Sequence, residues 1–162
     1  MFEGVTGDTA VAFTNTFAPE ETTADIRFGK QITSDSDVEG LNRQWQEGDS
    51  FTFLLRETDK DFENAQYRMS TTLTYENQTG SFTVPIPAEG TYYYQLTESQ
   101  RNVLPGFTND AASYHITITA AVDETTGELK TTTSIQTVSY THLDVYKRQA
   151  VRNERVSEVF LR

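Results

Sequence analysis

The segment most informative about the fold is Gly90-Thr91-Tyr92-Tyr93-Tyr94-Gln95-Leu96-Thr97-Glu98. Its apolar members Tyr92, Tyr94 and Leu96 recur at every second position, which is the period of a β-strand with one buried face. Aromatic residues and threonine are also favoured in strands. Glu98 stands in phase with these apolar residues, so the pattern that predicts the strand also predicts a carboxyl group that faces the core.

Similar segments recur along the chain and predict further strands. They are rich in Thr, Tyr, Phe and Ile and lack the Leu and Ala runs that are typical of helices. Turn-forming clusters of Ser, Asp, Pro and Gly separate them. Short strands interrupted this often predict an all-β fold, an immunoglobulin-like β-sandwich without crossover helices. The predicted strands span residues 9–17, 25–33, 50–57, 67–75, 81–84, 91–98, 113–122 and 128–137.

Two more polar side chains share the phase of apolar neighbours. Lys30 is in phase with Phe28, and Asn15 is in phase with Phe17, so both are expected to point inward. Burying an unpaired charge is costly, so an inward lysine or glutamate needs a partner, neutralisation or a strand-end position that reaches water. The plainer interpretation is that Lys30 extends to solvent from a sheet edge and that Glu98 is solvated at the end of its strand.

Composition excludes several classes of function. The chain has 13 Lys and Arg against 24 Asp and Glu, a net charge of -11, whereas nucleic-acid binding needs clustered positive charge. The absence of cysteine excludes disulfides, thiolate zinc sites and a cysteine nucleophile. The sequence has no run of about 18 apolar residues for a membrane span, and we expect any export signal to lie outside it. No cofactor motif, paired-histidine metal spacing or Ser, His and Asp arrangement stands out, so a turnover enzyme is not expected.

Four stretches together resemble a known family. Residues 13–17 read Phe-Thr-Asn-Thr-Phe, 26–30 read Ile-Arg-Phe-Gly-Lys, and 45–53 read Trp-Gln-Glu-Gly-Asp-Ser-Phe-Thr-Phe. With residues 90–98 they match, in order, the F-x-N-x-(aromatic), lysine-strand, W-x-x-G-D-x-F-x-F and G-x-Y-x-Y-x-(aliphatic)-x-E motifs. Over about residues 8–137 the chain thus resembles the isopeptide-linkage domains of Gram-positive pilins and cell-wall adhesins, in particular the repeated domain of streptococcal-type backbone pilins.

The resemblance implies roles for three residues. In such domains a lysine amine attacks the carboxamide of an asparagine on the last strand, ammonia leaves, and a Lys–Asn isopeptide bond crosses the core. By this resemblance Lys30 is the nucleophile, Glu98 is the acid that shuttles protons, and Asn15 is the crosslink acceptor of a preceding domain. Burial favours the neutral forms that the reaction needs, and fixed neighbours replace a bimolecular encounter. The reaction occurs once per molecule, without turnover.

The resemblance also divides the chain into parts. We expect residues 1–18 to be the last strand of a preceding domain, 19–24 a linker, 25–137 an isopeptide-linkage β-sandwich that lacks its final strand, and 138–162 an artefact followed by a foreign tail.

The lack of a final strand has a chemical consequence. No second F-x-N-x-(aromatic) motif follows residues 128–137, so we expect Lys30 and Glu98 to remain an unlinked pair. The alternative is that residues 9–17 fold back into the vacant edge of the sheet and bring Asn15 towards Lys30.

The segment after residue 137 differs in charge and in codon pattern. Residues 1–137 hold 8 basic and 21 acidic side chains, net -13, whereas residues 138–162 hold 5 and 3, net +2. Residues 138–143 can be encoded by a DNA sequence that is the reverse complement of one that can encode residues 144–149. Such an inverted repeat resembles two back-to-back transposase end sequences of the kind used to prepare DNA sequencing libraries. We interpret 138–149 as an assembly artefact and the remaining tail as foreign and poorly packed. The competing interpretation is an authentic basic strand and short amphipathic helix.

The sequence therefore predicts a structural module of a Gram-positive pilus or adhesin stalk. Its expected partners are neighbouring domains of the same protein and, through sortase, other pilin subunits, and its expected location is the cell wall or cell surface. The alternative is a β-sandwich of a surface adhesin that binds a ligand or glycan, with exposed Tyr93 and Trp45 as sugar-stacking rings.

Overall fold

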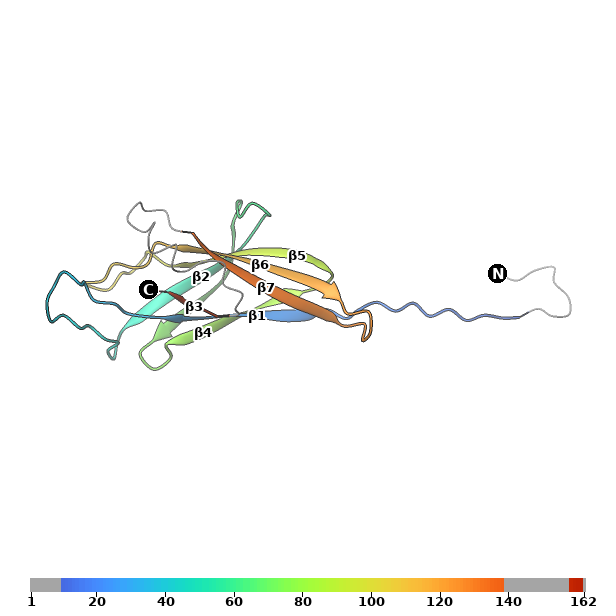
Figure 1. Cartoon of the computed structure of the whole chain (residues 1–162), viewed down its shortest axis with the longest axis horizontal. Helices are drawn as coiled ribbons and strands as arrows, with labels where there is room; N and C mark the ends of the chain where they lie inside the picture. The colour runs from blue at the N-terminus through green and yellow to red at the C-terminus, as the bar shows by residue number, and fades with distance from the viewer. Residues whose placement is uncertain (1–9, 139–157, 162) are drawn as a thin grey trace.

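The structure is a computed structural model that describes residues 10–138 and 158–161 (Figure 1). Its strands are β1 (Thr22–Lys30), β2 (Ser50–Thr58), β3 (Gln66–Thr74), β4 (Thr79–Ile86), β5 (Gly90–Glu98), β6 (Ser113–Val122), β7 (Leu129–Val138) and β8 (Glu158–Leu161). The bounds of β1 to β7 lie within three residues of those expected from the sequence.

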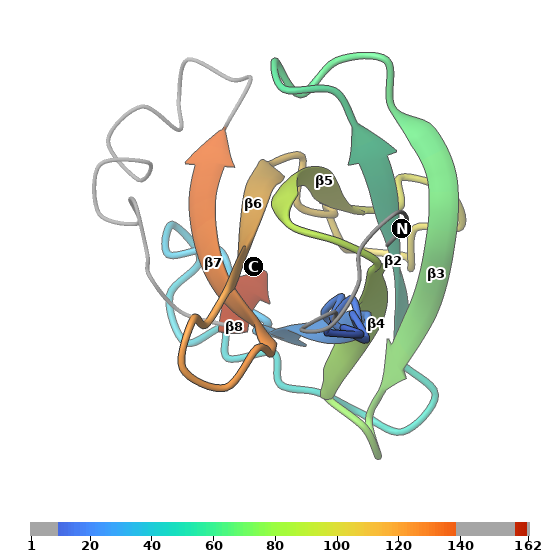
Figure 2. The ribbon, with the colours of Figure 1, turned by 90° about the vertical axis from the view of Figure 1, so that its right-hand side faces the viewer.

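The strands form two sheets that pack face to face (Figure 2). One sheet has the order β4-β1-β8 and the other the order β3-β2-β5-β6-β7. The turn between β3 and β4 passes from one sheet to the other. Neighbouring strands within each sheet run antiparallel apart from the pair β1 and β8. The all-β sandwich is therefore confirmed. None of the described residues belongs to a helix long and apolar enough to cross a membrane.

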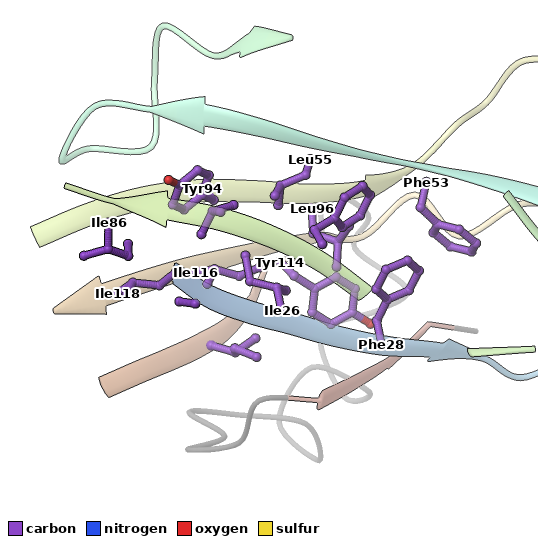
Figure 3. Close-up of a cluster of buried hydrophobic side chains, with 14 of the residues drawn as sticks. Ile26, Phe28, Phe53, Leu55, Ile86, Tyr94, Leu96, Tyr114, Ile116 and Ile118 are labelled. Atoms are coloured by element: carbon purple, nitrogen blue, oxygen red, sulfur yellow. The ribbon is translucent and has the colours of Figure 1, made fainter. Parts of the chain in front are cut away.

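The core lies between the sheets and is built from inward positions of β1 to β7 (Figure 3). In β1, Ile26 and Phe28 are buried, and the Phe28 ring stacks on Phe82 with centroids 5.4 Å apart and tilts against Phe53 at 5.0 Å. Each such side chain contributes about 1.5–3 kcal/mol by leaving water. Lys30 occupies the next inward position of the same strand, so the alternation that builds the core also delivers an amine to it.

The N-terminal segment differs from the prediction. Residues 10–21 form no strand and extend away from the sandwich (Figure 1). Val11, Phe13 and Phe17 are 70%, 91% and 72% exposed, and Asn15 is exposed with them. The prediction that Asn15 points into a core is therefore wrong for this chain. The physical reason is that a strand needs a neighbour for its backbone hydrogen bonds, and no described strand lies beside this segment.

The edge of β1 holds a strand that the sequence did not predict. Residues 158–161 form β8, which runs parallel to β1 in the register Arg27↔Glu158, Phe28↔Val159, Gly29↔Phe160 and Lys30↔Leu161. The expected vacant edge is thus occupied over these four positions, and this part of the tail pairs with the sheet where we expected poor packing or a helix. The inverted-repeat interpretation concerns residues 138–149, which lie outside the described residues apart from Val138 at the end of β7.

Candidate functional site

Lys30 and Glu98 meet between the two sheets. Lys30 ends β1 of one sheet and Glu98 ends β5 of the other, and the Lys30 Nζ lies 3.1 Å from the Glu98 Oε2. The residues are 7% and 4% exposed. The structure thus contradicts the interpretation in which each charge reaches solvent separately. Two strand ends from facing sheets bring an amine and a carboxyl group together in a nearly dry place, where an ion pair does not recover its full desolvation cost.

A group of three aromatic rings lies on one side of the amine. The Phe51 ring lies under the Lys30 Nζ, with 4.7 Å from the nitrogen to the ring centroid. Trp45 and Phe107 each contact Phe51 edge to face, at centroid distances of 5.3 and 5.4 Å. The Trp45 indole Nε1 also donates a hydrogen bond of 3.3 Å to the backbone oxygen of Lys30. These three rings limit the access of water on one side of the pair and hold the end of β1 in place.

An ion pair at the rim supports this aromatic group. The Arg43 guanidinium donates two hydrogen bonds to the carboxylate of Asp49, at 2.8 and 2.9 Å, and its carbon lies 4.9 Å from the centre of the Phe107 ring. The backbone N–H of Gln46 also donates to Asp49, at 2.9 Å. The hydrogen bonds from Arg43 hold the pKa of Asp49 below its ordinary value. The loop that carries Trp45 is thereby held next to Phe107, whose ring contacts Phe51.

The environment of Glu98 favours its neutral form. Burial raises the pKa of Glu98, and the positive charge of Lys30 and the backbone N–H of Asp110 oppose this effect. The Asp110 N–H donates to Oε2 at 2.7 Å, so Oε2 has two donors. Oε1 is also buried, and among the described residues it has no hydrogen-bond partner. A protonated Glu98 could use Oε1 to donate to a further acceptor beside Lys30.

Asn15 cannot be that acceptor within its own chain along the edge of β1. A parallel alignment that placed Asn15 beside Lys30 would require residues 18–21 to return along the length of β1, about 26 Å at 3.3 Å per residue. Four residues span at most about 14 Å. An antiparallel hairpin through the same residues would set Asn15 near Ala24, about 20 Å from Lys30. The fold-back alternative from the sequence is therefore wrong.

The two rings of the glycan-binding alternative are both packed against the protein. Trp45 is half-buried against Phe51, as described above. Tyr93 is half-buried on the outer face of β5, where Phe62 contacts it edge to face at 5.5 Å. Neither ring therefore forms an open stacking platform. Within the described ranges, no group of three or more His, Asp or Glu residues is arranged to hold a metal ion.

Sequence reasoning identified the pair but missed its supporting residues. Alternation placed Lys30 and Glu98 inward, whereas nothing in the sequence indicated that Asp110 would donate its N–H to Glu98. That contact depends on how the loop between β5 and β6 folds. The Trp45 and Phe51 motif was noted as part of the resemblance, and the structure adds that both residues contact Lys30.

Comparison with protein families finds one matching family model. The model of the FctA family, described as the Spy0128-like isopeptide containing domain, matches residues 26–150. A comparison with curated proteins finds no match. The family match covers most of the chain and includes the strands that bring Lys30 and Glu98 together, so this chain belongs to the family of Spy0128-like pilin isopeptide domains.

Proposed function

We propose that the chain is a structural module of a surface pilus or adhesin stalk in which Lys30 and Glu98 are the reactive pair of an autocatalytic isopeptide bond. The observation that carries the proposal is the buried contact of 3.1 Å between these two side chains, with the second oxygen of Glu98 unpartnered among the described residues. A buried ion pair is a weak source of stability. A chemical role accounts for it better than a structural one.

The proposed reaction balances without a cofactor. The neutral Nζ of Lys30 attacks the carboxamide carbon of an asparagine, while the acid of Glu98 donates its proton to the carbonyl oxygen. Glu98 then moves a proton from the attacking nitrogen to the leaving amide nitrogen, which departs as ammonia. As the carbonyl group re-forms, its oxygen returns the first proton to Glu98 and the acid is restored. One Nζ–C bond forms and one C–N bond breaks. No oxidant or reductant is needed.

The acceptor position can be inferred from the register of β8. Residue 161 is the Cα partner of Lys30 in the parallel pairing of β1 and β8. An asparagine at this position would stand beside Lys30. The chain has leucine there, which has no carboxamide, so Lys30 and Glu98 remain unlinked in this chain.

The proposed role is to carry mechanical load. A link between β1 and the strand beside it would join the beginning of the domain to its end, so that pulling on the two ends could not peel the edge strands from the sheet. Residues 1–18 then act as the last strand of a preceding domain, with Asn15 as the acceptor of that domain. The exposed apolar side chains of Val11, Phe13 and Phe17 support this role, because a preceding sandwich would cover them. Cell-surface placement and joining of subunits by sortase are part of the same proposal.

Tandem mass spectrometry of the Leu161→Asn variant tests the chemistry. We expect the parent chain to have the mass of its sequence, and L161N to lose about 17 Da as one ammonia and to yield a branched peptide through Lys30. Leu161→Ala is the matched control, because it changes the same position without supplying a carboxamide. L161N/E98Q supplies the carboxamide but lacks the acid, and we expect it to stay unlinked. An unlinked L161N whose β8 remains protected in hydrogen exchange would overturn the proposal.

A further inference from the structure

The loop between β5 and β6 is fastened to the end of β5 by side-chain amides. The Nδ2 of Asn109 donates to the backbone oxygen of Ser99 at 2.9 Å, and Asn109 is only 7% exposed. The Nε2 of Gln100 donates to the backbone oxygens of Asp110 and Glu98, at 2.8 and 3.2 Å. These bonds tie both sides of the loop to the strand that ends in Glu98.

The fastened loop makes the two oxygens of Glu98 inequivalent. It presents the N–H of Asp110 to Oε2 at 2.7 Å, the same oxygen that accepts from the Lys30 Nζ. Oε1 accepts no hydrogen bond from the described residues. A backbone N–H is a donor and can never accept a proton, so this contact disfavours a proton on Oε2.

The position of the proton follows from the state in which lysine can react. A nucleophilic Lys30 must be neutral and must keep its lone pair for attack, so its contact with Oε2 is a donation from N–H. With two donors directed at Oε2, the carboxylic proton belongs on Oε1. That is the oxygen left to polarise the carbonyl group of the acceptor amide.

We infer that Asn109 and Gln100 are positioning residues for the link-forming reaction, which hold the Asp110 N–H on Oε2 and thereby place the transferable proton on Oε1 of Glu98. This inference rests on the proposed function. Neither residue touches the reacting atoms in the contacts described here, and both act through Asp110 and Glu98. The remaining charged groups that act on Glu98 are Lys30, which favours its ionised form, and the Asp110 carboxylate, which disfavours it.

The first test needs no crosslink and therefore keeps Leu161. Carbon-detected NMR would follow the titration of the Glu98 carboxyl group in the parent chain and in the Asn109→Ala and Gln100→Ala variants. The Asp110 N–H lowers the pKa of Glu98, so loosening the loop should move the titration to higher pH. Asn64→Ala is the matched control, since it removes an amide-to-carboxylate bond of 2.7 Å to Asp59 in another loop. Gln100 is exposed, so Q100A preserves the readout if N109A fails to fold.

The second test measures the rate of link formation against pH in the L161N background. We expect N109A and Q100A to slow the reaction about tenfold or more and to move the alkaline limb of the profile to higher pH, whereas N64A changes neither. Unchanged titration of Glu98 together with an unchanged rate profile in both variants would overturn the inference while the proposed function stands. If L161N itself forms no link, the proposed function fails, and the positioning role fails with it.

Discussion

Leu161→Asn is expected to convert an unlinked sandwich into one that is covalently closed. In the structure, position 161 is the Cα partner of Lys30 on the parallel strand β8. The substitution supplies the carboxamide that the proposed reaction of Lys30 and Glu98 requires.

The stabilisation can be estimated from the loop that the new bond would close. Residues 30 and 161 are separated by about 130 residues of chain, and the chain-entropy model for a crosslink of this span gives about 5 kcal/mol. The thermal midpoint of a chain of this size moves by about 3 °C per kcal/mol, so the linked form should melt about 15 °C higher. The gain arises in the unfolded state, because the link removes conformations that the open chain could adopt.

Scanning calorimetry on L161N and L161N/E98Q measures this difference. The two variants share the change at position 161 and differ in the ability to form the link, and L161A reports the effect of losing the leucine. Mass spectrometry on the same samples assigns each melting curve to linked or unlinked chains. If linked L161N melts at the same temperature as L161N/E98Q, the reasoning is refuted. That result would mean that a link between β1 and β8 does not restrict the part of the chain that unfolds cooperatively.

Three further outcomes follow from the structure. Because burial raises the pKa of Glu98 above its ordinary 4.5, the folded chain holds that proton more tightly than the unfolded chain. The stabilisation of the folded chain by this proton is fully present below pH 4.5, and it is lost as the pH rises through the raised pKa of Glu98. In urea titrations the parent should therefore lose stability relative to E98Q as the pH increases, and a relative gain would contradict the assignment. Gly127→Ala should lower the free energy of unfolding by about 1–2 kcal/mol, because alanine is strained at a positive φ. The φ of Gly127 is +76°. It should cost the same in a Phe17→Ala background, because the Phe17 ring that a Cβ would meet at 2.6 Å is free to move. Rescue by F17A would instead identify a steric clash. Phe51→Ala should cost about 3–5 kcal/mol because the ring is buried, whereas the exposed Phe13→Ala should change the free energy of unfolding by less than about 0.5 kcal/mol. Equal losses would show that Phe13 belongs to the core.

The fold class, the approximate bounds of β1 to β7 and the inward direction of Lys30 and Glu98 follow from the pattern of residues along the chain. The physical reason is local. Successive residues of a strand face opposite sides, so an apolar residue at every second position identifies the buried face and every polar side chain that shares it. The same rule was wrong for Asn15, because alternation predicts a face only where a second strand is present to complete the sheet.

Which groups meet depends on how the strands and loops pack in three dimensions. Lys30 and Glu98 lie 68 positions apart and contact each other because two sheets pack face to face. The partner strand of Lys30, the donation from the Asp110 N–H and the contact of Phe51 with the amine also depend on how distant segments are brought together. Such contacts have no period along the chain. Burial of the pair, which raises the pKa of Glu98, is likewise a property of the assembled core.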